Sequence, residues 1–142
     1  MGHCPSGRNR AGKSTLLRGF AGFQPMEYES FRIDGVETPL ASTRHRDLVC
    51  SVLDQSIWLR GLTVWDHFRL FAPVKECQRA LELFDIEHLA YRIPATLSTG
   101  QRQRANLAST LVRPWRVLLL DEPESGLDEE HQGILAATYK AR

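Results

Sequence analysis

The sequence has few cysteines and almost no net charge. Its three cysteines, Cys4, Cys50 and Cys77, form no Cys-x-x-Cys pair and lack the Cys/His spacing of a zinc site. They therefore favour neither a disulfide framework nor a structural metal, and a reducing cytosol is their simplest environment. The formal net charge of +1 argues against a nucleic-acid or acidic-membrane surface, because such surfaces carry a strong basic excess.

Long apolar runs are also lacking. No segment reaches the roughly 18 to 20 apolar residues that a membrane-spanning helix needs, and no signal-peptide pattern precedes Gly7. Any role at a membrane is therefore expected to pass through a partner. The remaining composition is ordinary for a globular domain, since 42% of the 142 residues are hydrophobic and 25% are charged.

Residues 7–15 match the phosphate-loop pattern G-x-x-x-x-G-K-[ST]. Backbone N–H groups of such a loop turn inward, and the following helix adds the positive end of its dipole, so that together they bind an anion. Lys13 would reach the β- and γ-phosphates of a nucleotide, and the Ser14 hydroxyl would bind Mg²⁺. The alternative is a surface turn rich in glycine and arginine. The predicted ATP-binding residues are Gly7, Arg8, Asn9, Arg10, Ala11, Gly12, Lys13, Ser14 and Thr15.

Periodicity and chain breakers predict the elements that follow this loop. They are a helix over 13–20 ended by Gly19 and Gly22, a hairpin over 30–36, a strand over 48–53, a helical subdomain over about 60–113, a strand over 116–120, and a terminal helix that follows 125–128 and stops at 142. We therefore expect an α/β fold of the P-loop NTPase class. Its three-layer core would hold an incomplete parallel sheet, beside a small antiparallel edge and the compact helical subdomain.

Polar residues follow both predicted strands. Gln55 comes after the run 48–53, at the end where ligands bind in open α/β sheets. Asp121 and Glu122 follow the run 117–120 in the same way. Asp121 would hold Mg²⁺, directly or through water, and Glu122 would act as general base on the attacking water. An acidic turn at a strand end is the alternative, and a phosphate loop upstream makes it improbable.

A second helix whose N-terminus could bind an anion is predicted in the helical subdomain. The sequence 97–104 follows Pro94 and opens a helix to about Val112, with Ser98 or Thr99 as its N-cap. This end could bind an anion, or it could be an ordinary capped helix with an arginine-rich exposed face. The side chains of Trp58 and Trp65 are expected in the core or at a partner, and the isolated His67 and His88 receive no role.

In this order the motifs resemble the nucleotide-binding domain of ABC-type ATPases, over nearly the whole chain. By that resemblance, residues 7–15 correspond to the Walker A loop, Gln55 to the Q-loop, and Asp121 with Glu122 to Walker B and its catalytic glutamate. The resemblance implies Lys13, Gln55 and Glu122 as catalytic residues. It implies Ser14, Gln55 and Asp121 as magnesium ligands.

The family also works as head-to-tail dimers, in which the signature of one subunit closes over the ATP of the other. Two helix N-termini that face one triphosphate neutralise it better than one. The signature LSGGQ corresponds to Leu97 followed by Ser98, Thr99, Gly100 and Gln101, and the D-loop corresponds to Ser125, Gly126, Leu127 and Asp128.

The chain departs from the family pattern in three respects. Arg10 replaces a glycine of Walker A and would cost about 1 to 2 kcal/mol if that position needs a positive φ. Thr99 replaces the first glycine of the signature and should weaken it. The aromatic residue that stacks on adenine and the switch histidine have no counterpart within 1–142, and His131 lies too soon after Asp128 to be that histidine. We therefore expect an internal fragment or a product truncated at both ends.

The function expected is an ATP-hydrolysing subunit of an ABC transporter, with ATP and Mg²⁺ as cofactors. Its partners would be a membrane-spanning subunit and a second ATP-binding subunit, with no nucleic acid, and it would lie in the cytoplasm against the inner face of the cell membrane. The alternatives are a non-catalytic or decayed nucleotide-binding fragment, and a soluble ABC-type ATPase that acts on translation or DNA.

Overall fold

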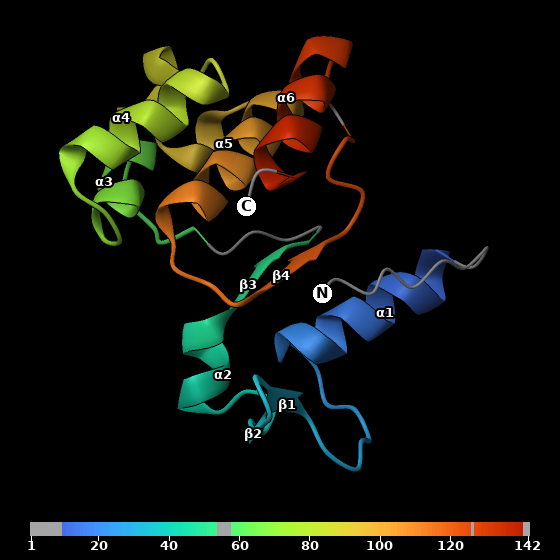
Figure 1. The fold of residues 1–142 in the computed structure, drawn as a ribbon. Helices are drawn as coiled ribbons and strands as arrows, with labels where there is room; N and C mark the ends of the chain where they lie inside the picture. The colour runs from blue at the N-terminus through green and yellow to red at the C-terminus, as the bar shows by residue number, and fades with distance from the viewer. Residues whose placement is uncertain (1–9, 54–57, 126, 141–142) are drawn as a thin grey trace. The chain divides into compact units, whose positions relative to one another are not determined.

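The computed structural model describes residues 10–53, 58–125 and 127–140. Five of the predicted site residues lie outside the described residues: Gly7, Arg8, Asn9, Gln55 and Gly126. The chain divides into two compact units (Figure 1). The first, called here the sheet unit, contains the chain up to Asp54 together with Trp115–Asp121, and the second, the helical unit, contains Gln55–Pro114 together with Glu122–Arg142.

Two parallel strands form the centre of the sheet unit. Strand β3 (Val49–Val52) pairs with β4 (Val117–Leu120) in parallel, from Val49 opposite Val117 to Val52 opposite Leu120. Cys50 and Val52 of β3 are buried, and helix α1 (Arg10–Ala21) packs against both strands. The parallel pairing of the two apolar runs is thereby confirmed.

The antiparallel edge is also confirmed. Strand β1 (Arg32–Ile33) pairs with β2 (Val36–Glu37) through a turn at Asp34 and Gly35. Both turn residues have positive φ, 52° and 75°, which an Asp-Gly pair accepts at low cost. The Arg116 guanidinium donates from Nε and Nη2 to the Asp34 carboxylate at 2.9 and 3.1 Å and lowers the pKa of that carboxyl.

Helix α1 begins earlier and ends later than the sequence indicated. We expected a helix over 13–20, and the structure has it from Arg10 to Ala21, so that Gly12 also lies inside the helix. Gly19 lies close to Met26: a Cβ there would lie 2.5 Å from Met26 Sδ, so a larger residue would require the Met26 side chain to move. The helix ends in a Schellman motif at Gly22, where the N–H of Gly22 binds Gly19 O at 3.0 Å and that of Phe23 binds Arg18 O at 2.9 Å.

A short helix that the sequence did not reveal precedes β3. Helix α2 (Thr43–Leu48) begins after Ser42, whose Oγ accepts the N–H of His45 at 3.2 Å. His45 is almost fully buried, and its Nε2 hydrogen-bonds to Phe20 O, in the last turn of α1, at 2.7 Å. The polar sequence of α2 has no apolar periodicity, so its position depends on this tertiary contact rather than on pattern.

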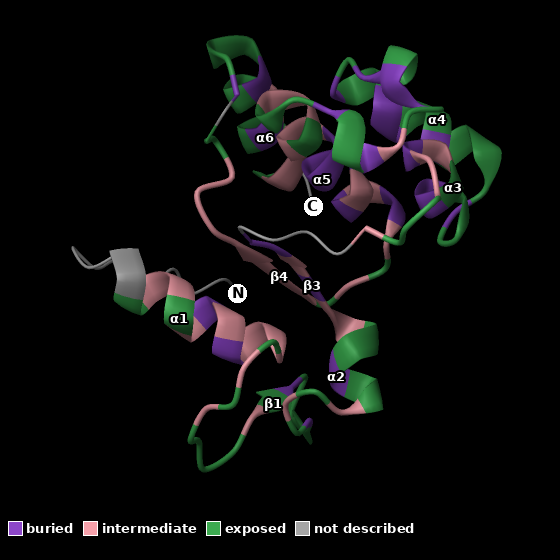
Figure 2. Ribbon diagram, turned by 180° about the vertical axis from the view of Figure 1, so that it is seen from behind, coloured by how far each residue is buried: buried purple, intermediate pink, exposed green. Residues whose placement is uncertain are grey.

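Four α-helices build the helical unit around one apolar core (Figure 2). They are α3 (Val64–Arg69), α4 (Val74–Leu83), α5 (Thr99–Val112) and α6 (Glu129–Lys140), with the 3₁₀ helices η1 (Glu87–Leu89) and η2 (Pro94–Thr96) between α4 and α5. The side chains of Phe68, Phe84 and Leu107 are fully buried. Within the described ranges, no helix combines the length and the apolar character needed to cross a bilayer.

Candidate functional site

Ser14 and Asp121 lie in direct contact although 107 positions separate them in the sequence. Ser14 lies in the second turn of α1, and Asp121 follows the last residue of β4. The Ser14 Oγ donates a hydrogen bond to Asp121 Oδ2 at 2.8 Å. The Asp121 N–H also binds Val52 O at 3.1 Å, which continues the parallel ladder one step beyond the strands. The contact therefore lies at the carboxyl end of the parallel pair, where open α/β sheets bind ligands.

This pair has the chemistry of a magnesium site. Mg²⁺ prefers oxygen ligands and is usually held by one or two carboxylates together with substrate phosphates and water. A hydroxyl and a carboxylate oxygen 2.8 Å apart can both turn to one such ion. Lys13 precedes Ser14 in the same helix, so a cation for the phosphates stands next to the candidate metal ligands in the chain.

The backbone of the predicted phosphate loop is described from Arg10 onward and is helical. The backbone N–H groups at the start of an α-helix point along its axis, and this positive end of the helix dipole favours an anion. The cost considered for Arg10 does not apply, because helical backbone has a negative φ.

The predicted signature begins helix α5. Ser98 is its N-cap, as one of the two expected residues, and forms a capping box with Gln101. Ser98 Oγ accepts the Gln101 N–H at 3.2 Å, and Gln101 Oε1 accepts the Ser98 N–H at 3.0 Å. Thr99 and Gly100 are the first two residues of the helix. The interpretation as an ordinary capped helix and the interpretation as a partner-binding signature both agree with this geometry.

Glu122, the predicted general base, has strained backbone. Its φ is 47°, and left-handed backbone in a non-glycine residue costs about 1 to 3 kcal/mol. Such strain persists where the surroundings fix the conformation. Here the Glu122 carbonyl accepts the N–H of Ser125 at 2.9 Å, which closes a tight turn around Pro123.

The predicted D-loop leads into α6 through Asp128. Asp128 Oδ1 accepts the backbone N–H of His131 at 2.9 Å and contacts His131 Nδ1 at 2.6 Å. The backbone hydrogen bond, followed by the side-chain one, lowers the pKa of Asp128. His131 is buried within α6.

The lowered pKa of Asp128 makes part of the stability depend on pH. A carboxyl with a depressed native pKa stabilises the fold above its unfolded pKa and loses that contribution as pH falls through the native value. We therefore expect Asp128→Asn to lower the free energy of unfolding at pH 7 and to have progressively less effect below about pH 4. Urea titrations of both proteins between pH 7 and pH 2.5 measure this difference, and a difference that stays constant over that range would contradict the prediction.

His67, to which the sequence assigned no role, is a buried structural residue. Its Nε2 accepts the N–H of Leu59 at 2.7 Å, so its Nδ1 carries the proton and donates to Thr63 O at 2.8 Å. The rings of Trp58 and His67 lie edge to face, with their centroids 4.8 Å apart. Trp58 Nε1 donates to Asn106 Oδ1 on α5 at 2.9 Å. The capping box of Thr63 and Asp66 is the sequence signal that could have placed His67 on a helix near this turn.

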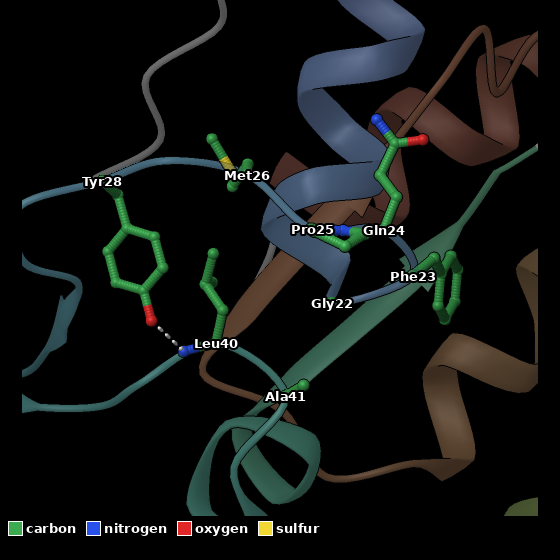
Figure 3. A pocket seen from close by; sticks show the side chains of 8 residues that line it. All are labelled: Gly22, Phe23, Gln24, Pro25, Met26, Tyr28, Leu40 and Ala41. Atoms are coloured by element: carbon green, nitrogen blue, oxygen red, sulfur yellow. Dashed lines mark hydrogen bonds between the residues drawn. The ribbon is translucent and has the colours of Figure 1, made fainter.

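One hollow of about 320 Å³ lies in the sheet unit, beyond the C-terminal end of α1 (Figure 3). Its walls include no charged residue and consist of Gly22, Phe23, Gln24, Pro25, Met26, Tyr28, Leu40 and Ala41. The hydroxyl of Tyr28 accepts the N–H of Leu40 at 3.0 Å and closes one side. Gln24, one of the lining residues, donates from its Nε2 to Thr15 O at 3.1 Å, next to Ser14 in the chain. None of these eight lining residues is itself a predicted phosphate-site residue.

The parallel strand pair, the helix packed against it and the Ser14–Asp121 contact at its carboxyl end define a P-loop nucleotide-binding domain. The family model described as "ABC transporter" matches residues 6–125. The chain therefore belongs to the ABC transporter family.

Individual relatives agree with this assignment. The chain is 37% identical, over 95% of its length, to the cytochrome c biogenesis ATP-binding export protein CcmA of Roseobacter denitrificans. It is 34% identical, over 86% of its length, to the thiamine import ATP-binding protein ThiQ of Histophilus somni. The match spans 62% and 61% of those two proteins. A solved ATP-binding subunit of an ABC transporter superposes with a TM-score of 0.78 at 24% identity, covering 94% of this chain and 59% of that one, which bears on the fold alone.

Proposed function

We propose that this chain binds ATP with Mg²⁺ and hydrolyses it to drive transport across a membrane. The membrane-spanning part would be a separate subunit, and a second ATP-binding subunit would complete a head-to-tail dimer at the cytoplasmic face of the membrane. The proposal rests on the Ser14–Asp121 contact of 2.8 Å. Relatives whose names describe ATP-binding proteins for import and for export support it.

The proposed roles follow from the chemistry of each side chain. Lys13 would bind the β- and γ-phosphates as a point charge, and Ser14 and Asp121 would hold the magnesium ion together with Gln55. The ion would supply positive charge that neutralises the phosphate oxygens. Glu122 would accept a proton from the attacking water, which it can do only as the ionised carboxylate.

The remaining roles involve the dimer. Residues 98–101 would bind the ATP of the second subunit at the N-terminus of α5, where the helix dipole favours an anion. Residues 125–128 would form the D-loop.

Binding of a fluorescent ATP analogue in the presence of Mg²⁺ tests the phosphate site. We expect Lys13→Ala to weaken equilibrium binding at least tenfold, or about 1.4 kcal/mol or more, because the variant loses the cation that faces the phosphates. Lys75→Ala is a matched control, since Lys75 is an exposed lysine of α4. Its affinity should equal that of the parent, and circular dichroism should show that all three proteins are folded.

If Lys13→Ala bound the ATP analogue as tightly as the parent chain, the proposed role of the phosphate loop in nucleotide binding would be contradicted. A folded parent chain that binds no ATP analogue at all would refute the proposed function.

A further inference from the structure

The side chain of Gln103 holds the turn that carries Glu122. Gln103 lies in the second turn of α5, and its Nε2 donates to the carbonyl oxygen of Pro123 at 3.0 Å. Both residues belong to the helical unit and are half-buried. Pro123 follows Glu122 directly, so this hydrogen bond fixes the peptide next to the predicted general base.

The turn needs an external support because its backbone is strained. Glu122 has a φ of 47°, and a proline follows it, which restricts the backbone of the preceding residue further. Within the turn, the hydrogen bond from the Ser125 N–H to Glu122 O, at 2.9 Å, closes the chain on itself. The bond from Gln103 comes instead from a helix, whose packing in the core makes it a rigid support.

We propose that Gln103 is a positioning residue for Glu122: its side-chain amide, anchored on α5, keeps the 122–125 turn in the conformation that directs the Glu122 carboxylate. This inference rests on the proposed function, in which Glu122 activates water. It adds a residue that neither the sequence motifs nor the relatives assign.

The same contact connects two functional segments within one subunit. Helix α5 begins at Thr99, so the proposed partner-binding residues 98–101 and the donor Gln103 lie on consecutive turns of one helix. A displacement of α5 by the second subunit's ATP would therefore pull directly on the Pro123 carbonyl. Gln103 would in this way link occupancy of one ATP site to the orientation of Glu122 for the other.

The variant Gln103→Met tests the role of the amide, since methionine has a similar length but no N–H donor. We expect kcat for ATP hydrolysis to fall about tenfold, because small misplacements of a catalytic group cost this much or more, while KM for ATP changes less than twofold. Arg69→Met is the matched control. It also removes one hydrogen bond from a side chain to a backbone carbonyl, Arg69 Nη1 to Ala72 O at 3.0 Å, and should leave kcat unchanged.

A double-mutant cycle separates positioning from a general structural effect. If Gln103 acts through Glu122, the loss from Gln103→Met should disappear, to within twofold, when Glu122 is already replaced in Glu122→Gln. A loss of the same size in both backgrounds would overturn the proposal, as would an unchanged kcat in the single variant.

Hydrogen exchange supplies a readout that does not require hydrolysis. The Ser125 N–H is held by Glu122 O inside the turn, so Gln103→Met should accelerate exchange of this amide about tenfold, whereas Arg69→Met should not. An unchanged exchange rate would overturn the role of Gln103 by itself. If Glu122→Gln instead hydrolyses ATP as fast as the parent chain, the proposed catalytic assignment fails, and the exchange experiment still decides whether Gln103 supports the turn.

Discussion

Glu122→Gln is expected to hydrolyse ATP about a hundredfold to a thousandfold more slowly than the parent chain. Glutamine keeps the size and shape of the side chain but cannot accept the proton of the attacking water at neutral pH. ATP affinity should stay within about twofold, because the phosphate-binding and metal-binding roles belong to Lys13, Ser14 and Asp121. Single-turnover hydrolysis and equilibrium binding measured on the same preparations separate the two effects. Turnover equal to that of the parent would exclude Glu122 as the base.

The backbone of Glu122 allows a second variant with an opposite effect on stability. Glu122→Gly should also lose turnover, yet raise the free energy of unfolding by up to about 1.5 kcal/mol. Relief of left-handed backbone is worth about 1 to 2 kcal/mol, and the entropy cost of glycine takes back about 0.5 to 1. Asp85→Gly is a matched control, since Asp85 has a φ of 54° in an exposed turn. It should gain less stability, because Asp accepts left-handed backbone at lower cost than Glu, and it should not lose turnover.

A stability gain that accompanies a loss of activity would indicate that Glu122 is kept in a strained conformation for function. If Glu122→Gly is less stable than the parent while Asp85→Gly is more stable, side-chain contacts of Glu122 outweigh its backbone strain. That outcome would contradict the prediction.

Local sequence pattern predicted the strands well, because each depends on a strong local signal. The apolar runs 117–120 and 48–53 are typical of parallel strands. Residues 49–52 of the second run pair in parallel with residues 117–120, although the four residues of β4 are only half-buried. The Asp34–Gly35 turn follows from the low cost of positive φ at these residues. The N-cap at Ser98 follows from its hydroxyl and from Gln101 three residues later.

The features that pattern missed depend on contacts between distant segments. Helix α2 has no apolar stripe and is held by His45 on Phe20 O. Glutamate does not favour left-handed backbone, so the positive φ of Glu122 could not be predicted from its residue type. The hydrogen bond from Gln103 to Pro123 O also has no local sequence signal.

In the candidate site, too, residue identities could be predicted from local sequence, but contacts between distant residues could not. Lys13, Ser14, Asp121 and Glu122 could be named from spacing, because phosphate binding and metal ligation restrict residue types strongly. The hydrogen bond between Ser14 and Asp121 could not be predicted from spacing, because 107 positions separate the two residues in the sequence.

Phe68→Ala is expected to lower the free energy of unfolding of the helical unit by about 3 to 5 kcal/mol. Phe68 lies on α3, and none of its surface is exposed, so truncation would leave a cavity that rigid neighbouring helices cannot fill. Leu70→Ala is the matched control two residues further on, because 60% of Leu70 is exposed. Its effect should stay within about 0.5 kcal/mol, as for ordinary surface substitutions.

Urea unfolding followed by circular dichroism measures both variants. Since a domain has only about 5 to 15 kcal/mol of stability in total, the loss at Phe68 should remove a large share of it and lower the unfolding temperature. The activity of Phe68→Ala would then decrease only because fewer molecules are folded. A high concentration of ATP should restore part of this activity, because a ligand that binds only the folded state stabilises that state. Glu122→Gln should show no such recovery, since it is expected to bind ATP normally. Similar losses of stability for Phe68→Ala and Leu70→Ala would contradict the position of the core.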